Sequence, residues 1–270
     1  MVVQHNLTAM NSNRMLGLTA SSQAKSTEKL SSGYKVNRAA DDASGLAISE
    51  KMRRQVRGLT QASANAQDGI SMVQTAEGAL NEVHDMLQRI NELAVKGENG
   101  TLTSEDRGYI DSEVQQLMSE IDRVASTTTF NEKNLLNGDC SSGVDLHVGA
   151  ECGQKITLKI KSMSCKAISL SGTTSTASAS GKLNASVKKA IKNLNKQRAE
   201  LGSVQNRLEH TINNLDNIVE NTTAAESQIR DTDMATEMVK YSNNNILAQA
   251  GQSMLAQANQ SNQGVLSLLG

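Results

Sequence analysis

Apolar residues recur at intervals of three and four along most of this chain, which is the spacing of one face of an α-helix. The pattern is most continuous between residues 43 and 95. A run of about fifty residues, at 1.5 Å per residue, predicts a helix of roughly 80 Å that packs against long partners. Its apolar positions are Leu46, Ile48, Met52, Val56, Leu59, Ala62, Ala66, Ile70, Val73, Ala76, Leu80, Val83, Leu87, Ile90 and Ala94.

A second helix is predicted to begin at Thr103, because a capping hydroxyl is followed there by two carboxylates, Glu105 and Asp106. Residues 96–100 end the first helix with two glycines, so we expect the second to fold back antiparallel. Its apolar positions are Tyr109, Ile110, Val114, Leu117, Ile121 and Val124.

A third helical pattern runs from Val187 to Ile229. Polar Arg198 and Gln205 interrupt its apolar seam, and polar residues in a seam can fix helix register at a cost in stability. Its apolar positions are Val187, Ile191, Leu194, Leu201, Leu208, Ile212, Leu215, Val219 and Ile229.

The hydrophobic period changes from helical to alternating in the middle of the chain. Residues 144–148 and 156–160 alternate apolar and polar around a loop with glycines, which predicts a β-hairpin. Residues 171–181, mostly Ser, Thr, Ala and Gly, predict a flexible connector. The predicted fold class is mainly α: a coiled-coil rod of three long helices with a β element at about 127–180.

The two ends of the chain are helical in pattern but nearly uncharged. Residues 241–270 contain no Asp, Glu, Lys or Arg and many amides, and charge is sparse before Lys25. Such composition suits helices that neighbours surround without desolvating a charge. We therefore predict that the terminal helices pair with each other and drive assembly; frayed ends on an ordinary bundle are the alternative. The predicted assembly residues are Leu7, Met10, Leu18, Leu247, Met254, Val265 and Leu268.

Composition excludes several classes of function. The net charge is -1, which gives no basic footprint for nucleic acid. No apolar run is long enough to span a bilayer, and the N-terminus lacks the pattern of a cleaved signal peptide. Proline is absent and aromatic residues make up 1%, which favours long helices over an aromatic globular core.

Three cysteines lie in the β region, at Cys140, Cys152 and Cys165, with His147 among them. An odd number leaves at least one thiol unpaired, so free thiols and a disulfide through Cys152 both stay open. The spacing does not match a usual zinc site. The chain also has no zinc-protease or nucleotide-binding motif, so we expect no metal, no cofactor and no enzymatic activity.

Both ends of the chain resemble bacterial flagellin. The stretches LSSGYKVNRAADDASGLAIS and GLTQASANAQDGISMVQTAEGALNEV are similar to the family's N-terminal region. IRDTDMATEMVKYSNNNILAQAGQSMLAQANQ and the ending VLSLLG are similar to its C-terminal region. The resemblance covers about residues 1–137 and 183–270, so it implies a short form that lacks the large outer domains.

The resemblance implies a structural subunit of the bacterial flagellar filament, exported unfolded and polymerised at the growing tip. Residues 1–42 and 232–270 would form the inner-tube coiled coil, and residues 43–231 the rod domain. Implied partners are further copies of itself, a flagellar export chaperone, and cap and hook-associated proteins. The implied location is the extracellular flagellum, reached without a cleaved signal peptide. A hook–filament junction protein and a secreted immune-modulating ligand are the alternative functions.

One further segment carries a specific implication of the resemblance. Residues 88–95, QRINELAV, are similar to the flagellin segment recognised by Toll-like receptor 5. Asn91 stands where many strongly signalling flagellins have Arg. The implied receptor-binding residues are Gln88, Arg89, Glu92, Leu93 and Glu113.

Overall fold

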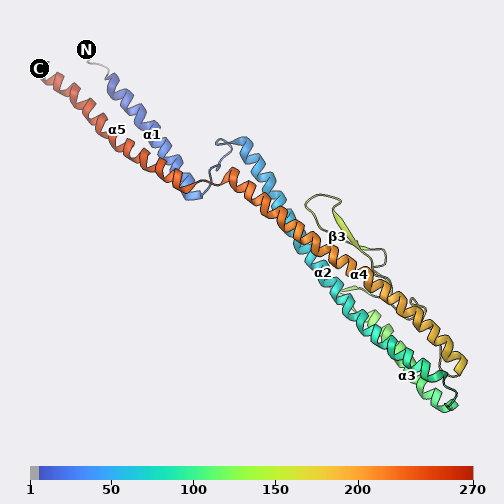
Figure 1. The fold of residues 1–270 in the computed structure, drawn as a ribbon. Helices are drawn as coiled ribbons and strands as arrows, with labels where there is room; N and C mark the ends of the chain where they lie inside the picture. The colour runs from blue at the N-terminus through green and yellow to red at the C-terminus, as the bar shows by residue number, and fades with distance from the viewer. Residues whose placement is uncertain (1–5, 270) are drawn as a thin grey trace. The chain divides into compact units, whose positions relative to one another are not determined.

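The computed structural model describes the backbone of residues 6–269 and the side chains of residues 6–261. This part of the chain holds five helices and four short strands, which confirms the predicted mainly α class (Figure 1). The helices are α1 (Leu7–Ser32), α2 (Ala43–Glu98), α3 (Ser104–Thr127), α4 (Ala177–Arg230) and α5 (Met234–Leu269). The strands are β1 (Thr129–Phe130), β2 (Lys133–Asn134), β3 (Val144–His147) and β4 (Lys155–Leu158).

The chain divides into two compact units. The terminal unit comprises Met1–Arg54 and Asn221–Gly270, and the central unit comprises Gln55–Glu220. The division passes through α2 and α4, so each of these helices contributes residues to both units.

The core of the central unit is formed by the facing seams of α2, α3 and α4. Most of the predicted seam positions are fully buried, including Leu80, Leu87, Ile90, Val114, Ile121, Leu194 and Leu201. The capping box at the start of α3 is present as well: Thr103 Oγ1 accepts from the Asp106 amide, and Asp106 Oδ2 accepts from the Thr103 amide. The prediction that Tyr109 belongs to the α3 seam was wrong. Its side chain is 69% exposed, and the adjacent Ile110 is buried instead.

The polar interruption of the α4 seam also differs from the prediction. The buried polar residue is Gln197, at 2% exposure, rather than Arg198 or Gln205. Its amide nitrogen donates to the Lys159 carbonyl at 3.0 Å, and its amide oxygen accepts from the Lys161 amide at 3.4 Å. An amide that both donates and accepts can be buried at little cost, whereas a guanidinium could not, so Arg198 lies beside the seam.

The β region contains the predicted hairpin and one that the pattern did not indicate. Strands β3 and β4 are antiparallel, with Val144 opposite Leu158, which confirms the prediction. Strands β1 and β2 have only two residues each, and Asn131 and Glu132 turn between them with positive φ angles. Such short strands, joined by a turn without glycine, leave no periodic signal in the sequence.

The predicted connector at residues 171–181 is helical in its second half, because α4 begins at Ala177. Its first half is held in place by Thr174, which is fully buried and whose amide donates to Asp111 Oδ1 at 2.7 Å. The side-chain composition suggested flexibility, but contacts with α3 order the segment.

In the terminal unit, α1 packs along α5, as the sequence predicted (Figure 1). Asn6 caps α1 by accepting from the Ala9 amide at 3.0 Å, and its own amide group donates to the Ala258 carbonyl of α5. Gly33 ends α1 with a φ of 75°, a left-handed conformation that a side chain would strain.

Candidate functional sites

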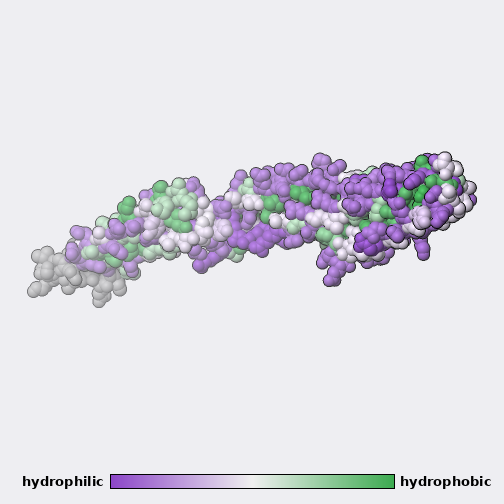
Figure 2. Space-filling view, turned by 90° about the horizontal axis from the view of Figure 1, so that it is seen from below, coloured by the Kyte–Doolittle hydropathy of each residue, from purple (hydrophilic) through white to green (hydrophobic). Residues whose placement is uncertain are grey.

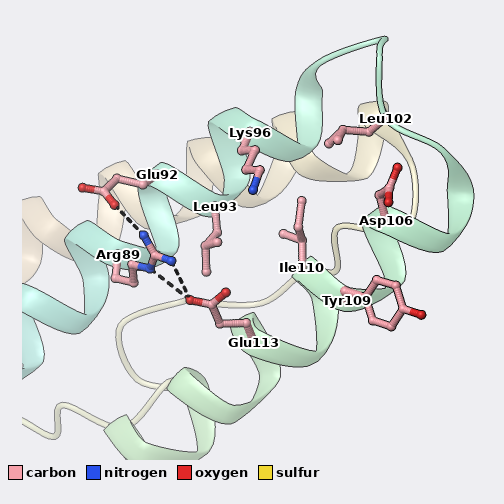
Figure 3. A pocket seen from close by; sticks show the side chains of 9 residues that line it. All are labelled: Arg89, Glu92, Leu93, Lys96, Leu102, Asp106, Tyr109, Ile110 and Glu113. Atoms are coloured by element: carbon pink, nitrogen blue, oxygen red, sulfur yellow. Dashed lines mark hydrogen bonds and ion pairs between the residues drawn. The ribbon is translucent and has the colours of Figure 1, made fainter.

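A polar cluster joins α2 to α3 in the central unit. The guanidinium of Arg89 lies between two carboxylates, with Nη1 at 3.1 Å from Glu92 Oε2 and Nη2 at 2.9 Å from Glu113 Oε1 (Figure 3). The hydrogen bonds that the Arg89 guanidinium donates to Glu113 and, to a smaller extent, to Glu92 raise its pKa above the usual value. The three side chains remain 45 to 67% exposed, so a partner could reach them.

Beside this cluster is a cavity of about 630 Å³ between the end of α2 and the start of α3 (Figure 3). Its lining combines charged rims with a small apolar floor. The lining residues are Arg89, Glu92, Leu93, Lys96, Leu102, Asp106, Tyr109, Ile110 and Glu113. Five of them, from Lys96 to Ile110, were not among the predicted site residues, because the resemblance implied only residues of the segment 88–95 and Glu113.

The predicted receptor-binding residues differ in exposure: Gln88, Arg89, Glu92 and Glu113 lie on the surface, whereas Leu93 is buried. Gln88 is exposed, with its amide 3.4 Å from His84 Nε2 on the preceding turn. Leu93 is only 3% exposed and belongs to the core, so its contribution would be to the cavity floor. Asn91 is half-buried, and its Oδ1 has no hydrogen-bond partner in the described part of the chain.

The predicted assembly residues mostly lie on the exposed surface of the α1–α5 pair. Leu7, Met10 and Leu18 on α1 are 70%, 62% and 60% exposed. Leu247 and Met254 on α5 are 57% and 62% exposed. Figure 2 shows green, apolar patches on the surface of this helix pair. Val265 and Leu268 belong to α5, but their side chains lie outside the described residues.

An apolar groove of about 430 Å³ runs between α1 and α5. Met15 and Leu16 line one side, and Leu247 and Met254 line the other. Gly251 lies opposite Leu16, and a methyl group placed there would approach Leu16 Cδ1 to 3.3 Å. The missing side chain at Gly251 thus lets the two helices approach closely.

A buried polar pair fixes the alignment of these helices. Ser26 Oγ donates to Glu237 Oε1 at 2.6 Å, and both residues are almost fully buried. This hydrogen bond lowers the pKa of Glu237, with a smaller contribution from Lys240. Sequence reasoning missed the pair, because the α5 seam was traced only through its uncharged part.

The two connectors between the helices of the terminal unit also contact each other. The Lys35 amide donates to the Arg230 carbonyl at 2.7 Å, and the Thr232 amide donates to the Gly33 carbonyl at 3.0 Å. The Arg230 guanidinium lies 4.5 Å from the centre of the Tyr34 ring and 3.2 Å from Glu50. These contacts hold the connectors together as the chain leaves α1 and enters α5.

The three cysteines are free thiols, and two of them are buried. Cys140 donates to the Asn134 carbonyl at 3.4 Å, and Cys165 donates to the Met118 carbonyl at 3.3 Å. Burial raises the pKa of both thiols, that of Cys165 to about 12. Cys152 is exposed in the loop between β3 and β4.

Among the described residues, no group of His, Cys, Asp and Glu side chains has a geometry that could hold a metal ion. Within the same part of the chain, no helix is both long and apolar enough to cross a membrane.

Two family models match most of the chain. The model of the bacterial flagellin N-terminal helical region matches residues 3–141, and that of the C-terminal helical region matches residues 185–269. A flagellar filament 31.3 kDa core protein of Treponema maltophilum is 50% identical, and a flagellin of Halalkalibacterium halodurans is 51% identical. Each alignment covers 100% of both chains.

A solved structure is similar as well. The crystal structure of Bacillus cereus flagellin aligns with a TM-score of 0.52 and 29% sequence identity. The alignment covers 56% of this chain and 88% of that one.

Proposed function

Because the chain belongs to the bacterial flagellin family, whose members are structural proteins of the flagellar filament and not enzymes, we propose that it polymerises through its α1–α5 pair. Flagellins of similar length align with the chain from end to end. The chain therefore corresponds to the short form of the family. The observation that carries the proposal is the set of large apolar side chains that α1 and α5 leave exposed. Burying several such side chains between copies would stabilise a polymer by roughly 1.5–3 kcal/mol each.

In the proposed filament, residues 1–42 and 232–270 form the inner tube, and residues 43–231 form the layer around it. The low charge of residues 1–24, which contain Arg14 alone, and of residues 241–270, which contain none, supports this arrangement, because neighbouring copies can enclose these parts with little desolvation of ions. The chain would reach the filament tip unfolded, through the growing flagellum. A chain without proline has no slow X-Pro isomerisation to delay its refolding there.

Electron microscopy of the purified chain after salt-induced, seeded assembly tests this function. We expect filaments that lengthen with protein supply. Short rings that stop growing would instead favour the alternative, a hook–filament junction protein. A chain lacking residues 1–42 and 232–270 should form no filaments and should keep most of its helicity by circular dichroism. Filaments formed without these ends would contradict the proposal.

We also propose that the monomer is recognised by Toll-like receptor 5 through Gln88, Arg89, Glu92 and Glu113, with Leu93 in the cavity floor. The arrangement of an exposed Arg between two carboxylates, beside a cavity with an apolar floor, supports this proposal. Few residues usually carry most of the energy of an interface, and Arg is prominent among them. A secreted immune-modulating ligand acting chiefly as a monomer is the alternative that would use the same residues.

Further partners follow from the proposed assembly route. An export chaperone would cover the exposed apolar side chains of α5 before polymerisation, and cap and hook-associated proteins would contact the ends of the filament. Pull-down of a chaperone by the full chain, lost when Leu247 and Met254 are changed to Asp, would support the first of these.

A further inference from the structure

The near-zero net charge of the chain conceals a strong segregation of charge. Residues 152–199 contain ten Lys or Arg residues and no Asp or Glu, although the whole chain has 27 basic and 28 acidic residues. Lys155 pairs with Asp145, and Arg198 pairs with Glu77. The other eight are exposed, and no ion pair neutralises them within the described part of the chain: Lys159, Lys161, Lys166, Lys182, Lys188, Lys189, Lys192 and Lys196.

Five of these eight lysines lie on one face of α4. Positions 182, 189, 192 and 196 follow one another at intervals of seven, three and four, and Lys188 flanks them. The buried positions Leu183, Val187 and Leu194 occupy the opposite face, against the core. Fourteen residues at 1.5 Å each give a row of charges about 21 Å long.

The segment after β4 brings a sixth lysine, Lys161, beside this row. Gln197 holds this segment against α4 through its bonds to the backbone of Lys159 and Lys161. A cavity of about 330 Å³ lies between this segment and α4, and Lys161 and Lys196 both line it. Its other lining residues are Ser162, Met163, Ala167, Ile168, Asn193 and Gln197.

We propose that this lysine surface, defined by the five lysines of α4 and Lys161, binds an extended acidic polysaccharide with repeated carboxylate or sulfate groups. A single exposed ion pair contributes only about 0–1 kcal/mol. A ligand must therefore present several charges along the 21 Å row to bind well. Asn193 and Ser162, beside the lysines, supply amide and hydroxyl groups for sugar hydroxyls.

Other polyanions fit this surface less well. Residues 152–199 contain no Phe, Tyr or Trp, so no ring is present on which nucleic-acid bases could stack. The large apolar residues of the same segment are buried, except Ile191, which is half-buried against the core, so no fully exposed apolar side chain is present to insert into a membrane. Protein interfaces are depleted in Lys, which disfavours an acidic protein or a second copy of this chain.

The test is fluorescence anisotropy of labelled heparin and labelled alginate oligosaccharides, titrated with the full-length monomer at 50 and 150 mM NaCl. We expect both to bind, more weakly at the higher salt. The variant Lys189→Gln, Lys192→Gln, Lys196→Gln should bind at least tenfold more weakly. The matched control is Lys25→Gln, Lys35→Gln, Lys51→Gln, which removes the same charge from exposed lysines elsewhere and should bind within twofold of the parent.

Several results would overturn the proposal. The first is the absence of binding at 50 mM NaCl, and the second is an equal loss of affinity in the two triple variants. The third is tighter binding of single-stranded DNA, polyglutamate or anionic vesicles than of heparin. If the triple variant at residues 189, 192 and 196 loses helicity by circular dichroism, two milder variants test the proposal instead. Arg at the same three positions should keep the affinity within twofold, and Lys192→Gln alone should weaken it about threefold. The opposite outcome in either would reject the lysine surface.

Discussion

Ser26 and Glu237 are 211 residues apart in the sequence, and the hydroxyl of one donates to the carboxylate of the other at 2.6 Å between α1 and α5. Both residues are nearly inaccessible to solvent, at 4% and 6% exposure. A single buried polar pair between two helices favours one alignment over its alternatives, because any shift of α1 removes the Ser26 donor and leaves the carboxylate with only the contact to Lys240 on its own helix. The pair therefore specifies how the two ends of the chain align.

Replacing Ser26 with Ala should weaken the α1–α5 pair. Removing the donor to a buried carboxylate costs about 1–3 kcal/mol, which corresponds to roughly a 5- to 150-fold higher critical concentration for polymerisation. Sedimentation of filaments at a series of protein concentrations measures this. Ser22→Ala, at an exposed position on α1, is the control and should leave the critical concentration unchanged. An unchanged value for Ser26→Ala would show that the pair does not set the alignment.

The same pair predicts a dependence on pH. The hydrogen bond from Ser26, helped by Lys240 and Lys29, holds the pKa of Glu237 below its usual 4.5. A carboxyl whose pKa is lower in the folded state adds stability above its unfolded pKa and loses it as the pH falls through the folded pKa. Thermal disassembly should therefore shift to lower temperature below pH 4.5, and the shift should be smaller in Glu237→Gln. Identical pH profiles for the two proteins would contradict this origin.

Arg89→Ala should weaken binding of the monomer to Toll-like receptor 5 by about 2 kcal/mol, or roughly 30-fold in affinity. The exposed guanidinium can place planar donors in a partner while its stem covers apolar surface. Surface plasmon resonance with monomeric protein measures the change. Ser178→Ala, exposed in the 171–181 segment, should have no measurable effect. Should the two variants bind equally well, this site is not the receptor contact.

Thiol labelling should distinguish the cysteines by burial. In the folded protein at pH 8, one equivalent should react quickly, at Cys152, because Cys140 and Cys165 are buried and burial raises the pKa of both thiols, that of Cys165 to about 12. Three equivalents should react in denaturant. Changing all three to Ser should leave assembly intact, since a hydroxyl can donate to the same carbonyls of Asn134 and Met118. Rapid reaction of three thiols in the folded protein would contradict the buried positions.

The sequence predicts those parts of the fold that repeat. The seams through Leu80 and Leu87 on α2 and Val114 on α3 show their period within a few turns, so their burial could be expected. The Thr103–Asp106 capping box is equally local. Tyr109 was misassigned because a helix pattern does not say how wide its buried stripe is, and the adjacent Ile110 fills the space.

Features that join distant segments could not be predicted in this way. The Ser26–Glu237 pair and the Gln197 contact with residues 159–161 each depend on a single polar residue, which carries no periodic signal. The cavity beside Arg89 could not be predicted for a similar reason, because residues of both α2 and α3 line it. The resemblance named Arg89, Glu92 and Glu113, but only the fold of α3 against α2 shows that Asp106 lies at the same cavity.

Helical reconstruction of the assembled filament by cryo-electron microscopy tests the central claim most directly, because it locates α1 and α5 and the surroundings of their exposed side chains. We expect the two helices to line the central channel. Leu247 and Met254, at 57% and 62% exposure in the single chain, should be buried against neighbouring subunits. A filament in which these two side chains face solvent, or in which residues 43–231 line the channel, would contradict it.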